Sequence, residues 1–159
     1  MAIKCLLISG AYDSGKTTSL CKFLSTIGDE YDFLNNERPK YESGKYKDCV
    51  CLLKDKNKER YLVVITPGDA MRYIDKHYKM ACKLLEEHNL SKDGDNVFFI
   101  AATRSSGATI EHYLKEFGYR SCLSILKSKS LFEDEIENDN NYFANIIRMS
   151  VSFLWKGEK

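Results

Sequence analysis

Apolar and polar residues follow one another along the chain in blocks that predict strands alternating with helices. Short runs that are apolar on both faces predict buried strands, whereas apolar residues at every third or fourth position predict amphipathic helices. The strand-like runs cover residues 3–8, 47–54, 60–66, 96–103 and 120–126. The helix-like runs start at Lys16, at Asp69 and near Ser106, and a last one follows residue 141. This alternation predicts a three-layer α/β fold with a mostly parallel sheet.

The connections between these runs add one hairpin and two irregular segments. Only the polar turn 55–59 separates the runs 47–54 and 60–66, which predicts an antiparallel β-hairpin. Residues 29–46 are polar and rich in tyrosine, and we expect an irregular connection there. The acidic stretch 132–141 is predicted to be a loop. The last helix should pack against the sheet through apolar residues at helical spacing, namely Tyr142, Phe143, Ile146, Ile147, Phe153 and Leu154.

Composition indicates one soluble domain spanning residues 1–159. Hydrophobic residues make up 43% of the chain and charged residues 30%, and no apolar run approaches the roughly 18 residues that span a bilayer. The first residues do not resemble a signal peptide, so we expect a cytoplasmic protein without a membrane partner. The net charge of +1 gives no clear nucleic-acid patch. The six cysteines form no CxxC pair, which predicts free and mostly buried thiols.

The stretch between the first strand and the first helix has the chemistry of a phosphate-binding loop. Residues 10–17 read GAYDSGKT and match the pattern G-x-x-x-x-G-K-[ST] in full. Glycines allow successive backbone amides to converge on one phosphate, and the helix that follows directs its positive end at the same anion. Lys16 can then reach the β- and γ-phosphates, and the Thr17 hydroxyl can coordinate Mg²⁺. A chance match in a chain of this length is on the order of one in a hundred.

This stretch resembles the Walker A motif of the P-loop NTPase superfamily, and its strand–loop–helix context is similar too. The resemblance covers about 30 residues, and the remainder of the chain agrees in architecture alone. It implies that Gly10, Gly15, Lys16 and Thr17 bind triphosphate and metal, with Thr18 near the α-phosphate. The other loop residues expected to contact the nucleotide are Tyr12, Asp13 and Ser14.

Two further strand ends should lie at the same edge of the sheet as this loop, because parallel strands end together there. The first is VVITPGD, in which Asp69 follows Pro67 and Gly68. P-loop enzymes place a carboxylate near this point to orient Mg²⁺ or its water, but in the GTPase-like alignment the aspartate position holds Ile65. Asp69 is the nearest substitute. It is equally well placed to be the N-cap of the following helix.

The second strand end is AATRSSGAT, where Thr103 and Arg104 precede a helix. Arg104 could stabilise a transferring phosphoryl group or bind a second substrate. The hydroxyls of Ser105, Ser106 and Thr109, with the helix N-terminus, form a second candidate anion site. Arg104 could equally be a surface residue, and the hydroxyls could be ordinary helix caps.

Other charged residues are weaker candidates. Asp48 begins a hairpin strand and could approach the metal, although a carboxylate on an edge strand usually meets only water. Four cations lie in or beside the long connection, which could close over a nucleotide: Arg38, Lys40, Lys45 and Lys47. The histidines lack partners at metal-ligand spacing, so we interpret His77, His88 and His112 as surface or packing residues.

The sequence favours ATP over GTP, because the stretch ILKSKS contains Lys127 but lacks the aspartate of a guanine-recognition motif. Three functions remain: a Mg²⁺-dependent ATPase or nucleotide-regulated switch, a small-molecule kinase, and a nucleotide-binding interaction module without turnover. The hairpin before TPGD is similar to the GTPase arrangement and favours a switch. A kinase would need Arg104 and residues 29–46 to hold an acceptor molecule. The sequence favours no oligomeric state.

Overall fold

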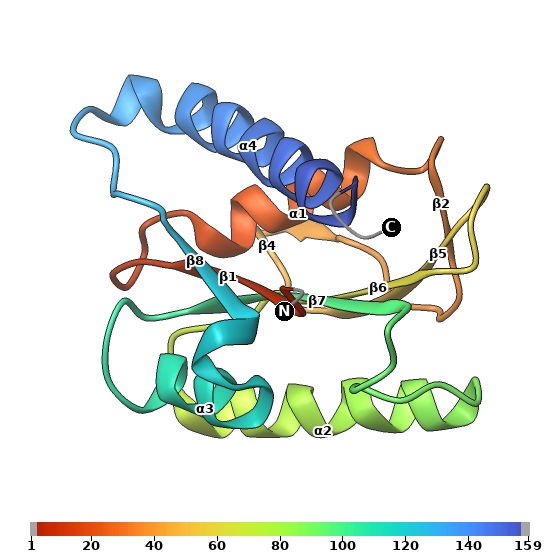
Figure 1. Cartoon of the computed structure of the whole chain (residues 1–159). Helices are drawn as coiled ribbons and strands as arrows, with labels where there is room; N and C mark the ends of the chain where they lie inside the picture. The colour runs from red at the N-terminus through yellow and green to blue at the C-terminus, as the bar shows by residue number, and fades with distance from the viewer. Residues whose placement is uncertain (1–2, 157–159) are drawn as a thin grey trace.

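The computed structural model describes residues 3–156 and arranges them in three layers, a six-stranded sheet between two layers of helices (Figure 1). The sheet has the strand order β2-β5-β6-β7-β1-β8. Its strands are β1 (Cys5–Ser9), β2 (Tyr31–Phe33), β5 (Val50–Asp55), β6 (Tyr61–Ile65), β7 (Val97–Thr103) and β8 (Cys122–Leu126). A separate hairpin pairs β3 (Tyr41–Glu42) with β4 (Lys45–Tyr46). The helices are α1 (Lys16–Thr26), α2 (Met71–Glu87), α3 (Ala108–Phe117) and α4 (Ile136–Lys156), with short 3₁₀ helices η1 (Tyr119–Ser121) and η2 (Glu133–Glu135).

The sheet is mixed but mostly parallel, as the sequence predicts. Strands β6, β7, β1 and β8 run parallel to one another, whereas β5 is antiparallel to β6 and β2 is antiparallel to β5. The predicted antiparallel hairpin is therefore confirmed as β5–β6. Strand β7 lies between β1 and β6, so these two strands are not neighbours. The segments that follow the four parallel strands all start at one edge of the sheet, where the candidate site lies.

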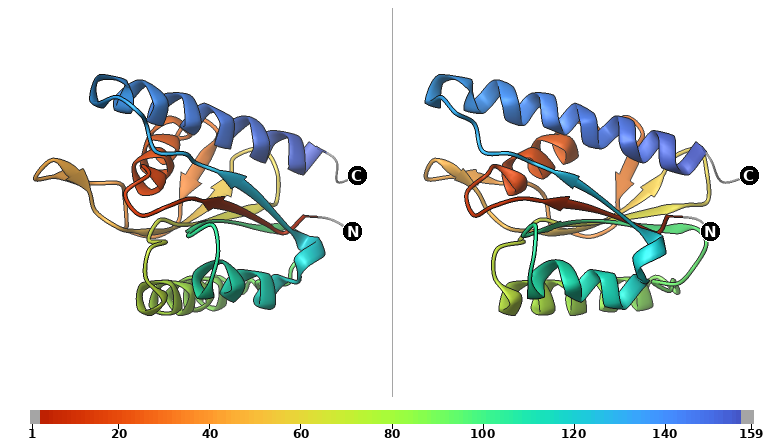
Figure 2. Two further views of the ribbon diagram at one scale, coloured as in Figure 1. Left: turned by 90° about the vertical axis from the view of Figure 1, so that its left-hand side faces the viewer. Right: turned by 60° about the vertical axis from the view of Figure 1, so that its left-hand side comes forward.

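Both faces of the sheet are covered, which explains why the strands are apolar on both faces. Figure 2 shows α1 and α4 on one face and α2 and α3 on the other. Leu6 of β1 packs into the first core together with Trp155 of α4. Leu7 of β1 packs into the second core together with Tyr113 of α3. Alternate side chains of one strand thus hold two helical layers in place.

The segment 29–46, predicted as irregular, contains three short strands. Strand β2 pairs with β5 at the sheet edge, and the buried Tyr31 ring lies 6.3 Å from the Trp155 ring, centroid to centroid. Strands β3 and β4 form the separate hairpin, whose turn residues Ser43 and Gly44 have positive φ. The prediction was wrong because strands of two or three residues have too few positions to show a period of two.

The prediction of a loop over residues 132–141 was also wrong. Residues 133–135 form η2, and α4 already begins at Ile136. Acidic side chains in the first turn, Glu137 and Asp139 among them, interact favourably with the positive end of the helix dipole. The acidic run therefore continues from η2 into the first turn of this helix.

The prediction for the last helix is confirmed in part: Phe143 and Ile147 are buried, and Ile146 and Leu154 are partly buried against the same core. The buried residues of this helix are Phe143, Ala144, Ile147, Val151 and Trp155, mostly four positions apart. Tyr142 and Phe153, which we expected to pack inward, are exposed. Helix α4 packs on α1 as well as on the sheet, so contact with α1 helps to determine which of its residues are buried.

The six cysteines are free thiols, four of them buried and two half-buried, as predicted. Within residues 3–156, no helix combines the length and the apolar character needed to cross a bilayer.

Candidate functional site

The loop between β1 and α1 has the curled backbone that the sequence pattern predicts. Asp13 and Gly15 have positive φ angles of 58° and 94°, and α1 begins at Lys16. Gly15 is favoured by its φ, and a Cβ atom there would lie 2.3 Å from the Oδ1 atom of Asn140 in α4, so another residue would also displace that side chain. A Cβ atom on Gly10 would lie 2.5 Å from the Lys127 carbonyl oxygen. The loop is therefore packed between α4 and the segment after β8.

Lys16 is buried and its ammonium group folds back over the loop. Its Nζ atom donates to the carbonyl oxygens of Gly10 at 2.8 Å and Ala11 at 2.9 Å. A third bond, also of 2.8 Å, joins Nζ to Oδ1 of Asp69. An ammonium group has three protons to donate, and these three acceptors account for all of them. A phosphate that binds Lys16 must therefore replace at least one of these oxygens.

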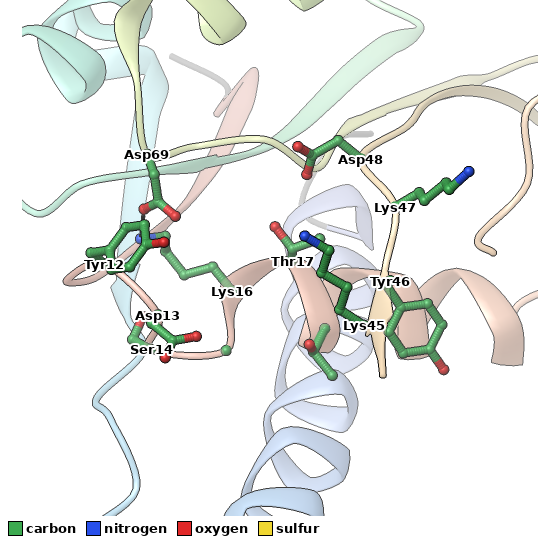
Figure 3. A pocket seen from close by; sticks show the side chains of 12 residues that line it. Tyr12, Asp13, Ser14, Lys16, Thr17, Lys45, Tyr46, Lys47, Asp48 and Asp69 are labelled. Atoms are coloured by element: carbon green, nitrogen blue, oxygen red, sulfur yellow. Dashed lines mark hydrogen bonds and ion pairs between the residues drawn. The ribbon is translucent and has the colours of Figure 1, made fainter. Parts of the chain in front are cut away.

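Asp69 binds Lys16 and does not cap helix α2. The helix begins at Met71, its N-cap residue is Ala70, and no side chain forms a capping hydrogen bond there. Of the two roles that the sequence left open, the N-cap role is therefore wrong, because the helix starts one residue later than that role requires. The carboxylate of Asp69 instead lies in the loop region, as Figure 3 shows. It is within reach of any group held by Lys16.

The Thr17 hydroxyl is oriented by the end of β6. It donates to the Thr66 carbonyl oxygen at 3.0 Å, and the Thr66 hydroxyl accepts from the Cys49 amide at 2.8 Å. A hydroxyl that donates in this way keeps its oxygen lone pairs free for another partner. Thr66 was not among the residues predicted for the site, although it lies at the end of a buried strand, which is the signal that identified Thr103.

Arg104 lies beside Asp69 and outside the walls of the cavity described below. Its Nε atom donates to the Asp69 carbonyl oxygen at 3.1 Å, and its guanidinium carbon lies 5.7 Å from the centre of the Tyr12 ring. Its backbone amide donates to the Thr109 hydroxyl at 3.0 Å. Arg104 thus connects the segments after β7 and β6 to the exposed Tyr12 ring.

A cavity of about 550 Å³ opens between the loop and the β3–β4 hairpin (Figure 3). This volume is within the range of small-molecule sites, roughly 300–1,000 Å³. One wall is formed by residues 12–18, and Asp69 adds a carboxylate. The opposite wall is formed by residues 45–48. Of the four cations expected near the nucleotide, Lys45 and Lys47 line this cavity, whereas Arg38 and Lys40 line an adjacent hollow.

Comparison of the chain with protein-family models, with curated proteins and with solved structures found no match.

Two buried hydroxyls beside the site have no hydrogen-bond partner among the described residues. They are the Oγ atom of Ser14 in the loop and the Oγ1 atom of Thr103 at the end of β7. Buried polar atoms are nearly always hydrogen-bonded in folded proteins, so each of these calls for a partner. Ser14 lines the cavity, whereas Thr103 is fully buried and does not line it.

Lys127 is a second buried lysine, located behind the loop. Its Nζ atom donates to the Ser14 carbonyl oxygen at 3.0 Å and to the Ser128 carbonyl oxygen at 2.8 Å. Burial lowers the pKa of this amine below its usual value. The sequence analysis considered Lys127 only for guanine recognition. Its place directly after β8 is the strand-end signal that could have identified it.

Asp48 brings a second carboxylate into the cavity wall. Partial burial is the largest cause that raises the pKa of Asp48, and the charges of Cys49 and Asp69 raise it further. His77 and Lys45 act in the opposite direction. The charged form of Asp48 is therefore less favourable here than in water.

The histidines lie outside the cavity wall. The Nδ1 atom of His77 is 2.6 Å from the Tyr73 carbonyl oxygen, and that of His88 is 2.9 Å from the Leu84 carbonyl oxygen. His112 packs against two tyrosine rings. Within residues 3–156, no three His, Cys, Asp or Glu residues are grouped as a metal site.

Proposed function

We propose that this protein binds a nucleoside triphosphate, with ATP favoured, and acts as a Mg²⁺-dependent ATPase or nucleotide-regulated switch of the P-loop type. The observation that carries the proposal is the environment of Lys16. The Lys16 ammonium is buried at the N-terminus of α1, next to a loop in which two residues have a left-handed φ. It faces a cavity large enough for a nucleotide. Each of these features favours an anion with several oxygen atoms.

The phosphates would replace the present partners of Lys16. The carbonyl oxygens of Gly10 and Ala11 and the carboxylate of Asp69 hold the ammonium in a position from which phosphate oxygens can take over. The amides of the loop and of the first turn of α1 supply further donors. Lys127 adds a positive charge behind Ser14, which favours the same anion.

The oxygen atoms around the cavity suit Mg²⁺. Thr17 offers a hydroxyl whose lone pairs are free, and Asp69 offers a carboxylate, both of them hard donors. Mg²⁺ typically binds through one or two protein oxygens together with phosphates and water, so a larger cluster of protein ligands is not needed. When bound, the cation would neutralise charge on the phosphate oxygens. Asp69 would then exchange Lys16 for the metal or for its water.

Turnover is less strongly supported than binding. The position that would carry a carboxylate in a GTPase-like alignment is Ile65, which is apolar and fully buried. Asp69 is the alternative carboxylate, but it is paired with Lys16. This pairing favours slow hydrolysis or, as the second candidate function, nucleotide binding without turnover. Arg104 lies outside the cavity wall, whereas Lys45 and Tyr46 line it, so only one of the two parts that a kinase would need for its acceptor faces the cavity.

Isothermal titration with ATP in the presence of Mg²⁺ tests the proposal. The wild-type protein should bind ATP, and Lys16→Ala should weaken binding by about 100-fold or more, since two charge-assisted hydrogen bonds are lost. Lys83→Ala, which removes an exposed lysine of α2, is the matched control and should bind as the wild type does. Circular dichroism checks that both variants are folded. A wild-type protein without detectable binding of ATP or GTP would refute the proposal.

A further inference from the structure

The β3–β4 hairpin contributes to the cavity wall that lies opposite the loop after β1. This hairpin has regular antiparallel pairing and a defined turn. Tyr41 pairs with Tyr46, Glu42 pairs with Lys45, and the turn residue Gly44 has a φ of 80°. An ion pair of 2.6 Å joins the Lys47 ammonium to the Glu42 carboxylate. Its residues Lys45 and Tyr46 line the cavity together with Thr17 and Thr18 of α1.

The cavity has two chemically different ends. At one end are Lys16, Asp69 and Tyr12, and at the other is the hairpin (Figure 3). In Figure 3 the Lys45 side chain extends toward Thr17, and the Tyr46 ring lies on the opposite side of the cavity from Tyr12. The terminal phosphates belong at the Lys16 end if the proposed function holds. Because the hairpin forms the opposite wall of the cavity, the other end of the nucleotide would then lie toward it.

An aromatic ring at that end fits a nucleobase. Tyr46 is half-buried, and its ring packs edge-on against the Tyr41 ring with centroids 5.1 Å apart, which holds it in place. Every nucleobase has a π-face, so it can stack on such a ring whatever hydrogen-bond donors and acceptors its edge carries. Tyr12 is less suited, since the Arg104 guanidinium lies over its ring and the Asp69 carboxylate lies beside it.

We propose that the β3–β4 hairpin is the base-binding end of the cavity, with the nucleobase stacked on Tyr46 and the Lys45 ammonium bound to the phosphates. This inference rests on the proposed function and adds to it the residue that distinguishes a nucleotide from a bare polyphosphate. Tyr46 is then a specificity-determining residue, because it acts on the base alone. Lys45 contributes to any ligand that carries the phosphates.

The test compares Mg²⁺-ATP with Mg²⁺-tripolyphosphate by isothermal titration. The wild type should bind ATP more tightly than tripolyphosphate. Tyr46→Ala should weaken ATP binding by roughly 5- to 150-fold, the range of one base–aromatic contact, and leave tripolyphosphate binding at its wild-type value. Tyr46→Phe keeps the ring and should keep the preference. Tyr119→Ala removes an exposed tyrosine of η1 and is the matched control. Lys45→Ala should weaken both ligands.

Three outcomes would contradict this inference and leave the proposed function intact. Equal wild-type affinities for ATP and tripolyphosphate would mean that the base is not bound. A Tyr46→Ala variant that weakens both ligands equally would assign Tyr46 to the shape of the hairpin instead. Loss of the ATP preference in Tyr12→Ala alone would place the base at the opposite end of the cavity. Binding of neither ligand by the wild type would refute the proposed function, and this inference with it.

Discussion

At the scale of single residues, the ion pair between Lys16 and Asp69 is the feature that decides how the site works. The two residues are 53 positions apart in sequence, and their charged atoms lie 2.8 Å apart. The lysine side chain is 3% exposed and the aspartate side chain 37%, so the pair is open to solvent on the aspartate side only. If the proposed function holds, Asp69 competes with phosphate for Lys16 when Mg²⁺ is absent and turns to the cation when Mg²⁺ is present.

Replacing Asp69 with asparagine separates these two roles. We expect Asp69→Asn to bind ATP about fivefold more tightly than the wild type in EDTA, because one negative charge beside the phosphates is removed. The gain in affinity on adding Mg²⁺ should shrink, and any turnover should fall. The melting temperature should change little, since the asparagine oxygen can still accept from Lys16. Titrations with and without Mg²⁺ measure both effects.

Asp75→Asn is the control for this experiment. It removes the same charge from the surface of α2, where Asp75 forms an ion pair with Lys79. Its ATP affinity and its response to Mg²⁺ should match the wild type. Weaker ATP binding by Asp69→Asn in EDTA would contradict the competition between Asp69 and phosphate.

At the scale of elements, the sequence predicts well what depends on local pattern. The strands β1, β5, β6, β7 and β8 and the loop after β1 were all recognisable, because an apolar run or a glycine pattern extends over enough residues. The partners of the loop depend on tertiary packing and could not be predicted. Asn140 lies against Gly15 only because α4 begins early, and Lys127 reaches Ser14 only because β8 pairs with β1.

The β3–β4 hairpin is the element whose integrity the proposed site requires. Gly44 has positive φ and open space around its Cβ position, so a larger residue there is strained but meets no neighbour. Gly44→Val should destabilise the hairpin by roughly 1–2 kcal/mol, expose its amides and weaken ATP binding. The melting temperature should be unchanged, because β3 and β4 are not part of the six-stranded sheet. Hydrogen exchange over residues 40–47 and titration with ATP measure these effects.

Gly28→Val is the matched control, since Gly28 also has open space around its Cβ position but its φ is not in the left-handed range. It should leave both hydrogen exchange in the hairpin and ATP binding as they are in the wild type. Unchanged exchange in Gly44→Val would contradict the role of the turn. Increased exchange with unchanged ATP affinity would show that the hairpin does not contribute to binding.

At the scale of the whole molecule, the three layers bring four strand ends to one edge, and the charges gathered there weaken the fold. Asp48 lies in the cavity wall near Asp69, and its raised pKa means that the folded protein holds the proton more tightly than the unfolded chain does. Stability therefore falls as the pH rises from 3.8 through the raised value, and the loss is complete above it. Function-bearing sites commonly lower stability in this way.

Asp48→Asn should accordingly unfold at a higher denaturant concentration than the wild type at pH 7, and the difference should vanish as the pH falls below 3.8, where the carboxyl is protonated in both states. Trp155 is the single tryptophan of the chain and is buried against Tyr31 and Phe98, so its fluorescence reports unfolding of the main core. Asp29→Asn, at an exposed position just after α1, controls for the change in net charge. A variant less stable than the wild type at neutral pH would mean that the Asp48 carboxylate supports the fold through contacts that its surroundings do not indicate.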